Sequence, residues 1–221
     1  SQGQNLGAHD GTSLLEVGID RFLGVPGRSM VIAAGNAGQH NSHARGAVAT
    51  GAMETVQFDI AANDRNRDFI DIWYTGSDRF DIRVTSPGGN STPVVSPGAP
   101  SASFSLPNGN QAFIASRLND PSNRDNRIVI ALSPGSSTTI QQGRWSFTLI
   151  GTTVVDGRFH AWVERGVDTV PSFVAPHRDH NGTLWIPGTS REAITVGSYI
   201  TKASSGVGGL SSFSSRGPTR D

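Results

Sequence analysis

The feature that most constrains the fold is a change in the spacing of apolar residues near position 54. Between residues 54 and 166, apolar and polar side chains alternate in five short stretches, at 56–60, 80–84, 128–132, 145–149 and 159–163. A period of two is typical of strands with one buried and one solvated face. Turn-forming segments separate the stretches, and no amphipathic helix interrupts them. We therefore predict an all-β sandwich or jelly-roll domain over 54–166.

The segments on either side of this domain have a different pattern. Residues 10–24 predict a helix, because Ser13 and Glu16 have the spacing of a capping box and Gly24 can end it. Residues 29–34 and 194–199 are short apolar runs, which favours parallel strands that pair with each other and are buried on both faces. The prediction is an α/β core, formed by residues 1–50 and 170–221 and interrupted by the β domain.

Composition excludes several classes of function. The 18 basic and 18 acidic residues balance, so neither nucleic acid nor an anionic membrane is an expected partner. No run approaches the roughly 20 apolar residues that span a bilayer. The absence of cysteine excludes disulfides, thiolate metal sites and a cysteine nucleophile, and it leaves the cellular compartment open.

Three motifs occur in an order that resembles the subtilisin-like serine proteases, the subtilases of peptidase family S8. They are SMVIAAGNAG at 29–38, PGTSREAITVGSY at 187–199 and GLSSFSSRGPTRD at 209–221. The insert is similar to the jelly-roll-like β-sandwich of spore-germination subtilases. The resemblance implies a fragment of the subtilisin-like parallel-sheet core, from the middle of the catalytic domain. It also implies a peptide or protein substrate, the rest of the protease domain as a partner, and an extracellular or cell-envelope location.

The resemblance also implies a set of site residues. Asn36 matches the oxyanion-hole donor, whose side-chain amide stabilises the charge that develops on the attacked carbonyl oxygen. From the residues alone, an Asn after Gly also fits a left-handed turn. Six further positions match substrate-binding segments, of which the first three match a strand that pairs with substrate. These are Ser1, Gln2, Gly3, Ala33, Ala34 and Gly35.

No catalytic nucleophile is expected within the chain. Ser13 and Ser190 both follow Gly-Thr, but neither is followed by the small residue and proline that the family's nucleophile motif requires, and both fit helix or turn caps. The family's aspartate and histidine motifs are absent. We expect the chain to begin after the Asp and His of the triad, to end before its Ser, and to be inactive alone.

Metal ions and cofactors are not expected either. The loop histidines His40, His43, His177 and His180 lack a helix to align them, so we predict that they are solvated. Asp and Asn cluster at 63–68 and 119–126, which raises calcium as a ligand, but interleaved arginines would repel it.

Two other classes of function remain open from the sequence. The chain could be part of a pseudoprotease that acts as a regulatory module. Alternatively, the β domain could bind carbohydrate or protein through an exposed aromatic platform. The candidates for that platform are Trp73, Tyr74, Trp162 and Trp185, although in β-sandwiches such residues more often pack in the core or against a neighbouring domain.

Overall fold

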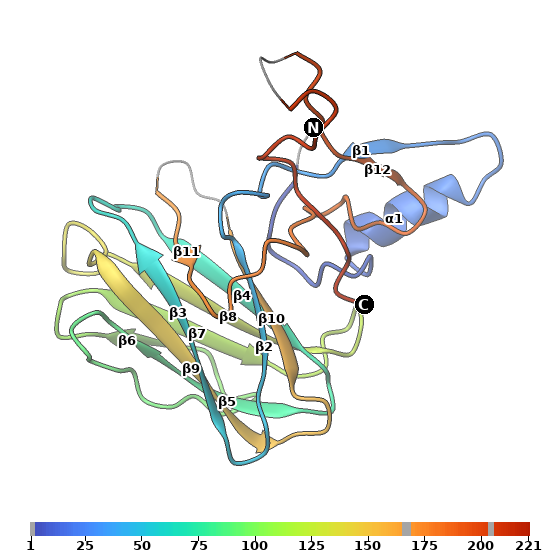
Figure 1. Ribbon diagram of the computed structural model, residues 1–221. Coiled ribbons are helices and arrows are strands. Elements are labelled where there is room, and N and C mark those ends of the chain that lie inside the picture. The colour runs from blue at the N-terminus through green and yellow to red at the C-terminus, as the bar shows by residue number, and fades with distance from the viewer. Residues whose placement is uncertain (1–2, 165–168, 203–205) are drawn as a thin grey trace. The chain divides into compact units, whose positions relative to one another are not determined.

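The computed structural model describes residues 3–164, 169–202 and 206–221, and backbone contacts divide the chain into two units (Figure 1). The central unit is Ala44–Arg178. The flanking unit combines Ser1–His43 with Asp179–Asp221. The sequence prediction of an independent domain at 54–166 concerns autonomous folding, and it stays a prediction.

The central unit contains two sheets. The six-stranded sheet has the order β2-β10-β4-β8-β7-β6 and the four-stranded sheet has the order β11-β3-β9-β5. The strands of the first are β2 (His43–Ala47), β4 (Asp68–Tyr74), β6 (Ala102–Ser105), β7 (Gln111–Arg117), β8 (Asn126–Ser133) and β10 (Arg158–Val163). Those of the second are β3 (Met53–Ile60), β5 (Arg79–Thr85), β9 (Gly143–Thr153) and β11 (Ser172–Phe173). Pairing is antiparallel along β10-β4-β8-β7-β6 and throughout the four-stranded sheet.

The two sheets share one apolar core. Every second residue of β3, namely Val56, Phe58 and Ile60, is buried, and the same alternation runs along β5 and β7. One hydrophobic cluster includes residues of both sheets, among them Tyr74 and Phe80, whose rings stack 4.4 Å apart. The five alternating stretches predicted from the sequence are confirmed as strands, within β3, β5, β8, β9 and β10.

The helix of the flanking unit, α1 (Leu14–Leu23), has the predicted capping box. The Ser13 hydroxyl accepts a hydrogen bond from the Glu16 backbone N–H at 3.3 Å, and the Glu16 side chain accepts one from the Ser13 backbone. Gly24 forms the C-cap. The buried face of α1 is polar, because Glu16 is fully buried and accepts a hydrogen bond from Thr189, whereas Leu14 is 90% exposed. No described helix is long and apolar enough to cross a membrane.

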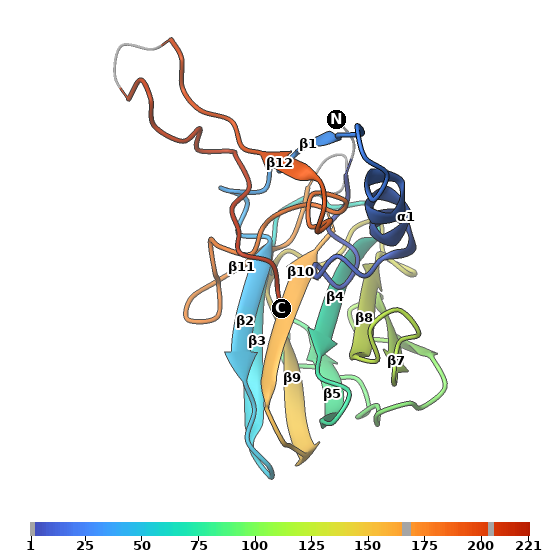
Figure 2. The same cartoon turned by 90° about the vertical axis from the view of Figure 1, so that its right-hand side faces the viewer.

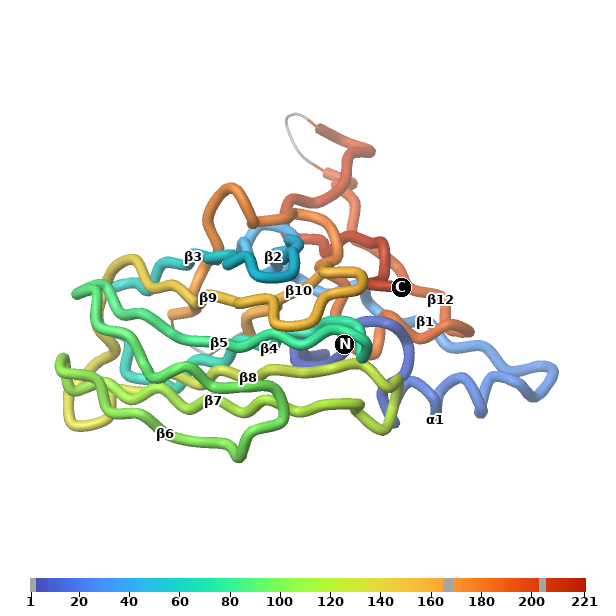
Figure 3. The backbone as a smooth tube through the Cα atoms, turned by 90° about the horizontal axis from the view of Figure 1, so that it is seen from below, coloured from blue at the N-terminus to red at the C-terminus, as the bar shows by residue number. Residues whose placement is uncertain are grey.

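The predicted pairing of the two apolar runs is also confirmed. Strand β1 (Val31–Ala33) pairs in parallel with β12 (Ile194–Val196), and Figure 2 shows them side by side. The backbone reverses between α1 and β1 (Figure 3). The prediction that both strands are buried on both faces is wrong, because Val31 is 64% and Ile194 is 56% exposed.

The predicted fold class, an α/β fragment of the subtilisin-like parallel-sheet core, is wrong. The described residues form one helix, and their only parallel pairing is the short sheet of β1 and β12, while the remaining strands build antiparallel sheets. The physical reason lies in the flanking segments. They contain one helical pattern and two apolar runs, which is too little to cover a parallel sheet on both faces, and period-two segments dominate the rest of the chain.

Candidate functional site

The residues after β1 form a loop that is fixed by hydrogen bonds to two other segments of the flanking unit. On one side, the Ala34 N–H donates to the Val196 carbonyl at 2.8 Å, and the Trp185 N–H donates to the Ala34 carbonyl at 2.9 Å. On the other side, the Ser215 N–H donates to the Gly35 carbonyl at 2.9 Å. The loop is therefore bonded immediately before the predicted functional residue Asn36.

The same loop is bonded immediately after Asn36. The Ala37 N–H donates to the Ser215 hydroxyl at 2.9 Å, and the Gly38 N–H donates to the Phe213 carbonyl at 3.0 Å. A Cβ on Gly38 would lie 2.1 Å from the Ser214 carbonyl oxygen, so only glycine fits there. Residues 34–38 thus have a conformation that is held from both ends.

Asn36 itself is exposed at the end of this rigid loop. Its side-chain amide makes no hydrogen bond with any residue that the structure describes. An Asn that served only the turn would bond its own neighbouring backbone. The geometry therefore leaves the Asn36 amide available to a ligand.

Gly35 and Gly3 both pack against the ring of Trp185. Gly35 has φ of 105°, and a Cβ there would lie 2.5 Å from Cγ of the indole. A Cβ on Gly3 would lie 3.0 Å from Cε3 of the same ring. Gly3 and Gly35 are predicted from the sequence as substrate-binding residues, but their shared contact with Trp185 is not. A contact between residues so far apart in the chain leaves no local signal.

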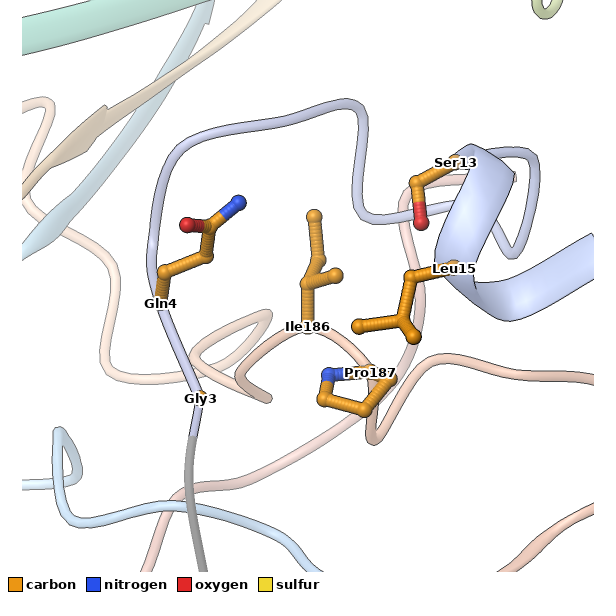
Figure 4. A pocket seen from close by; sticks show the side chains of 6 residues that line it. All are labelled: Gly3, Gln4, Ser13, Leu15, Ile186 and Pro187. Carbon is orange, nitrogen blue, oxygen red and sulfur yellow. The ribbon is translucent and has the colours of Figure 1, made fainter. Parts of the chain in front are cut away.

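The segment that contains Gly3 forms an edge next to Ile186. Gln4 and Ile186 exchange two backbone hydrogen bonds of 3.0 Å in an antiparallel bridge. A pocket of about 600 Å³ opens beside it, with Ile186 standing between Gln4 and Leu15 (Figure 4). Its lining is Gly3, Gln4, Ser13, Leu15, Ile186 and Pro187.

The other predicted substrate-binding residues have different surroundings. Ala33 is exposed at the end of β1, whereas Ala34 is buried and both of its backbone polar groups are bonded within the unit. The backbone hydrogen bonds of Ala34 therefore hold the loop in place, and its buried side chain is not accessible to a ligand. Ser1 and Gln2 lie outside the described residues.

Neither serine that follows Gly-Thr is paired with a histidine. The Ser190 hydroxyl donates to the Asp20 carboxylate at 2.5 Å, and the Ser13 hydroxyl caps α1. The described residues thus offer no activated serine at these two positions.

The prediction that all four loop histidines are solvated is wrong for two of them. His43 is 1% exposed and its Nδ1 lies 2.6 Å from the Asn181 carbonyl oxygen. His177 places its Nε2 2.7 Å from Oε1 of Glu54. His40 and His180 are exposed. Within the described residues, no three His, Cys, Asp or Glu side chains cluster as metal ligands.

The proposed aromatic platform is also wrong, because most of its members are buried. Trp73 is 3% exposed, and Tyr74 and Trp162 are each 1% exposed. These rings pack inside the protein, as aromatic residues of β-sandwiches commonly do. The carbohydrate-binding alternative therefore loses the feature that suggested it.

Comparison with solved structures shows a likeness to a protease. The chain resembles the solved structure of the CspB protease from Clostridium perfringens, with a TM-score of 0.84 and 25% sequence identity. The match covers 100% of this chain and 44% of that one, so the chain spans less than half of the length of its structural relative. The likeness supports a protease-related role in coarse terms.

No protein-family model and no curated protein matches the chain. The fold corrects the identification of the chain as the middle portion of a subtilase catalytic domain with a jelly-roll-like insert. The described residues are mostly β with one helix, and the comparison with solved structures supports a structural likeness to a protease.

Proposed function

We propose that this chain is part of a serine endopeptidase and that it supplies the oxyanion donor, Asn36. The observation that carries the proposal is an exposed amide on a loop whose neighbours on both sides are hydrogen bonded to other segments. A donor that is held in place before the reaction needs no reorganisation when charge develops, and this makes such groups effective. The likeness to a solved protease agrees with this role.

In the proposed reaction, a serine hydroxyl attacks the carbonyl carbon of a peptide bond and a base takes the hydroxyl proton. The carbonyl oxygen becomes negatively charged, and the Asn36 amide donates a hydrogen bond to it. Collapse of the intermediate expels the amine and leaves an acyl-enzyme, which water then hydrolyses. The described residues of this chain do not supply the serine–base pair at Ser13 or Ser190, so those groups would come from elsewhere in the enzyme.

Substrate binding is assigned to the surroundings of Trp185. We place the peptide main chain along the Gly3 edge and the residue before the scissile bond near Ala33 and Gly35. Both glycines approach the indole closely, so Trp185 limits the space on this side. Small side chains would therefore be preferred at that position of a peptide or protein substrate.

The test is Asn36→Leu in the complete enzyme that carries this chain. The kcat should fall by roughly 100- to 1,000-fold with little change in KM, because the lost hydrogen bond belongs to the transition state. Gln39→Leu is the matched control, since Gln39 is an exposed amide of the same loop and should leave kcat unchanged. An Asn36→Leu enzyme with normal kcat would refute the assignment.

The isolated chain provides a second measurement. Incubated with a fluorophosphonate probe, the 221-residue chain should show no serine labelling, because nucleophile and base act together. Labelling that disappears in Ser190→Ala or Ser13→Ala would overturn this. A complete protein that is folded but never labelled would instead favour the regulatory pseudoprotease.

A further inference from the structure

In the loop between β3 and β4, the acidic side chains are buried and the basic side chains are exposed. In the sequence Asp64-Arg65-Asn66-Arg67-Asp68, the two aspartates are 1% and 4% exposed and Asn66 is half-buried. Both arginines are exposed. The acidic and amide groups are therefore on the inner side of the loop, and the exposed arginines are on its solvent side.

Two carboxylate oxygens on the inner side have no hydrogen-bond donor beside them. Oδ2 of Asp64 and Oδ2 of Asp68 are buried, and neither accepts a hydrogen bond from a donor group of any described residue. No described arginine or lysine forms an ion pair with either carboxylate. A buried, uncompensated carboxylate is costly, and it ordinarily requires a positive charge or a proton beside it.

The loop is held in a defined shape around these oxygens. The Asn66 N–H donates to Oδ1 of Asp64 at 3.0 Å, and the Ile140 N–H donates to the Asp64 carbonyl at 2.7 Å. The loop therefore holds two buried carboxyl groups, those of Asp64 and Asp68, on its inner side, where both are open to a cation.

We propose that Asp64, Asn66 and Asp68 form a Ca²⁺ site in the central unit. The spacing Asp-x-Asn-x-Asp is that of the first ligands in calcium-binding loops, where three oxygen side chains converge on one ion. The interleaved arginines, which counted against calcium in the sequence, lie on the solvent side of the loop. Two carboxylates, one amide and completing waters make a hard oxygen site that suits Ca²⁺ better than Mg²⁺.

The test measures the melting temperature of the chelator-treated chain at pH 7.5. Adding 5 mM CaCl₂ should raise the Tm by about 2–4 °C, which is the shift expected in a chain of this size when the free ion is about five-fold above its Kd. MgCl₂ at the same concentration should give a smaller shift. Calorimetric titration should show one Ca²⁺ bound per chain.

Variants assign the effect to the loop. Asp68→Asn and Asp64→Asn should abolish the calcium-dependent rise, and Asp125→Asn, in the other Asp- and Asn-rich loop, should keep it. Because an aspartate variant could fail to fold, Asn66→Ala provides a milder change that keeps both carboxylates. It should raise the Kd for Ca²⁺ several-fold without changing the circular dichroism spectrum.

Two outcomes would overturn the proposal. One is a wild-type Tm that does not respond to Ca²⁺. The other is an Asp68→Asn variant that melts above the wild type with and without the ion, because the pair would then hold a shared proton rather than a cation.

Discussion

Gly35 combines an unusual backbone conformation with a close neighbour, and the two effects can be separated. Gly35→Ala should destabilise the chain by about 3 kcal/mol, because the new methyl group meets a positive φ and also the Trp185 ring. Gly27→Ala is the matched control, since Gly27 has φ of 84° and open space around it. The control should cost only about 1 kcal/mol in the free energy of unfolding.

Denaturant unfolding of the two glycine variants measures this difference. In a Trp185→Ala background, the cost of Gly35→Ala should fall to that of Gly27→Ala, because the steric contact has gone and the backbone strain remains. Equal costs in the wild-type background would show that the indole does not pack against Gly35. The residue that sets the width of the proposed cleft would then be a different one.

His9 should make the stability of the flanking unit sensitive to acid. The ring is 2% exposed, and its two nitrogens each lie 2.8 Å from a carbonyl oxygen, of Leu184 and of Asn5. Burial lowers the pKa of His9 to about 4, and the charged neighbours are Arg220 and Asp10. The unfolded chain therefore takes up a proton near pH 6.5, before the folded chain does.

The expected pH dependence has a definite sign. The stabilising contribution of a neutral His9 is complete above about pH 6.5 and is lost as the pH falls toward 4, by at most about 3 kcal/mol. The measurement is the free energy of unfolding from pH 7.5 to 4.5 for the wild type and His9→Gln. The variant should lose less stability over this range, and identical slopes would contradict the prediction.

At the scale of elements, one buried carboxylate joins two turns of the central unit, each of which connects a strand of one sheet to a strand of the other. Asp78, in the turn between β4 and β5, is fully buried and accepts hydrogen bonds from three consecutive backbone N–H groups in the turn between β9 and β10. The donors are Val155 at 2.6 Å, Asp156 at 3.1 Å and Gly157 at 2.7 Å. The carboxylate thus satisfies three backbone donors of that turn.

Removing this acceptor should weaken the whole sandwich. Asp78→Ala should lower the free energy of unfolding by about 3 kcal/mol, because it leaves buried N–H groups unsatisfied. Asp81→Ala, which removes a half-buried carboxylate from β5, is the control and should change stability by less than about 0.5 kcal/mol. Similar losses in both variants would mean that the turn finds other partners.

The elements that could be predicted from sequence are those with a regular local spacing of apolar or capping residues. Strands β3, β5 and β9 alternate cleanly, and the capping box of α1 is visible in four residues. Strand β4 was missed because its outward residues, Asp71 and Trp73, are also buried, so DFIDIWY does not alternate. Asp71 is compensated by an ion pair with Arg127 at 2.7 Å, a partner that no local pattern can reveal.

At the scale of the whole molecule, the sequence correctly predicted that Asn36 follows a strand. It did not predict which elements cover that strand. An apolar run shows that a strand is expected, yet the number of strands and helices that cover it depends on the rest of the fold. The runs of β1 and β12 were therefore predicted as buried, although they are largely exposed. In the same way, the contacts of Trp185 with Gly3 and Gly35 arise only in three dimensions.

The two units differ in how they bury apolar surface. The hydrophobic core cluster consists only of residues between Ala44 and Phe173, within the central unit. Among described residues of the flanking unit, the buried apolar side chains are Ala8, Ala34, Ala37 and Ile186, while Leu14 and Leu15 of α1 are exposed. Because a closed core is what allows independent folding, the central unit should be stable without the flanking one.

The last prediction compares two fragments of the chain. Residues 44–178 alone should unfold cooperatively, with a Tm within about 4 °C of the same transition in the 221-residue chain, since their core is complete. Residues 54–166, the boundaries expected from sequence, should fold but melt lower, because they lack the core residues Ala44, Val48 and Phe173. Circular dichroism at increasing temperature measures both. If the 44–178 fragment gave a random-coil spectrum, the central unit would depend on the flanking one and the inference from its core would fail.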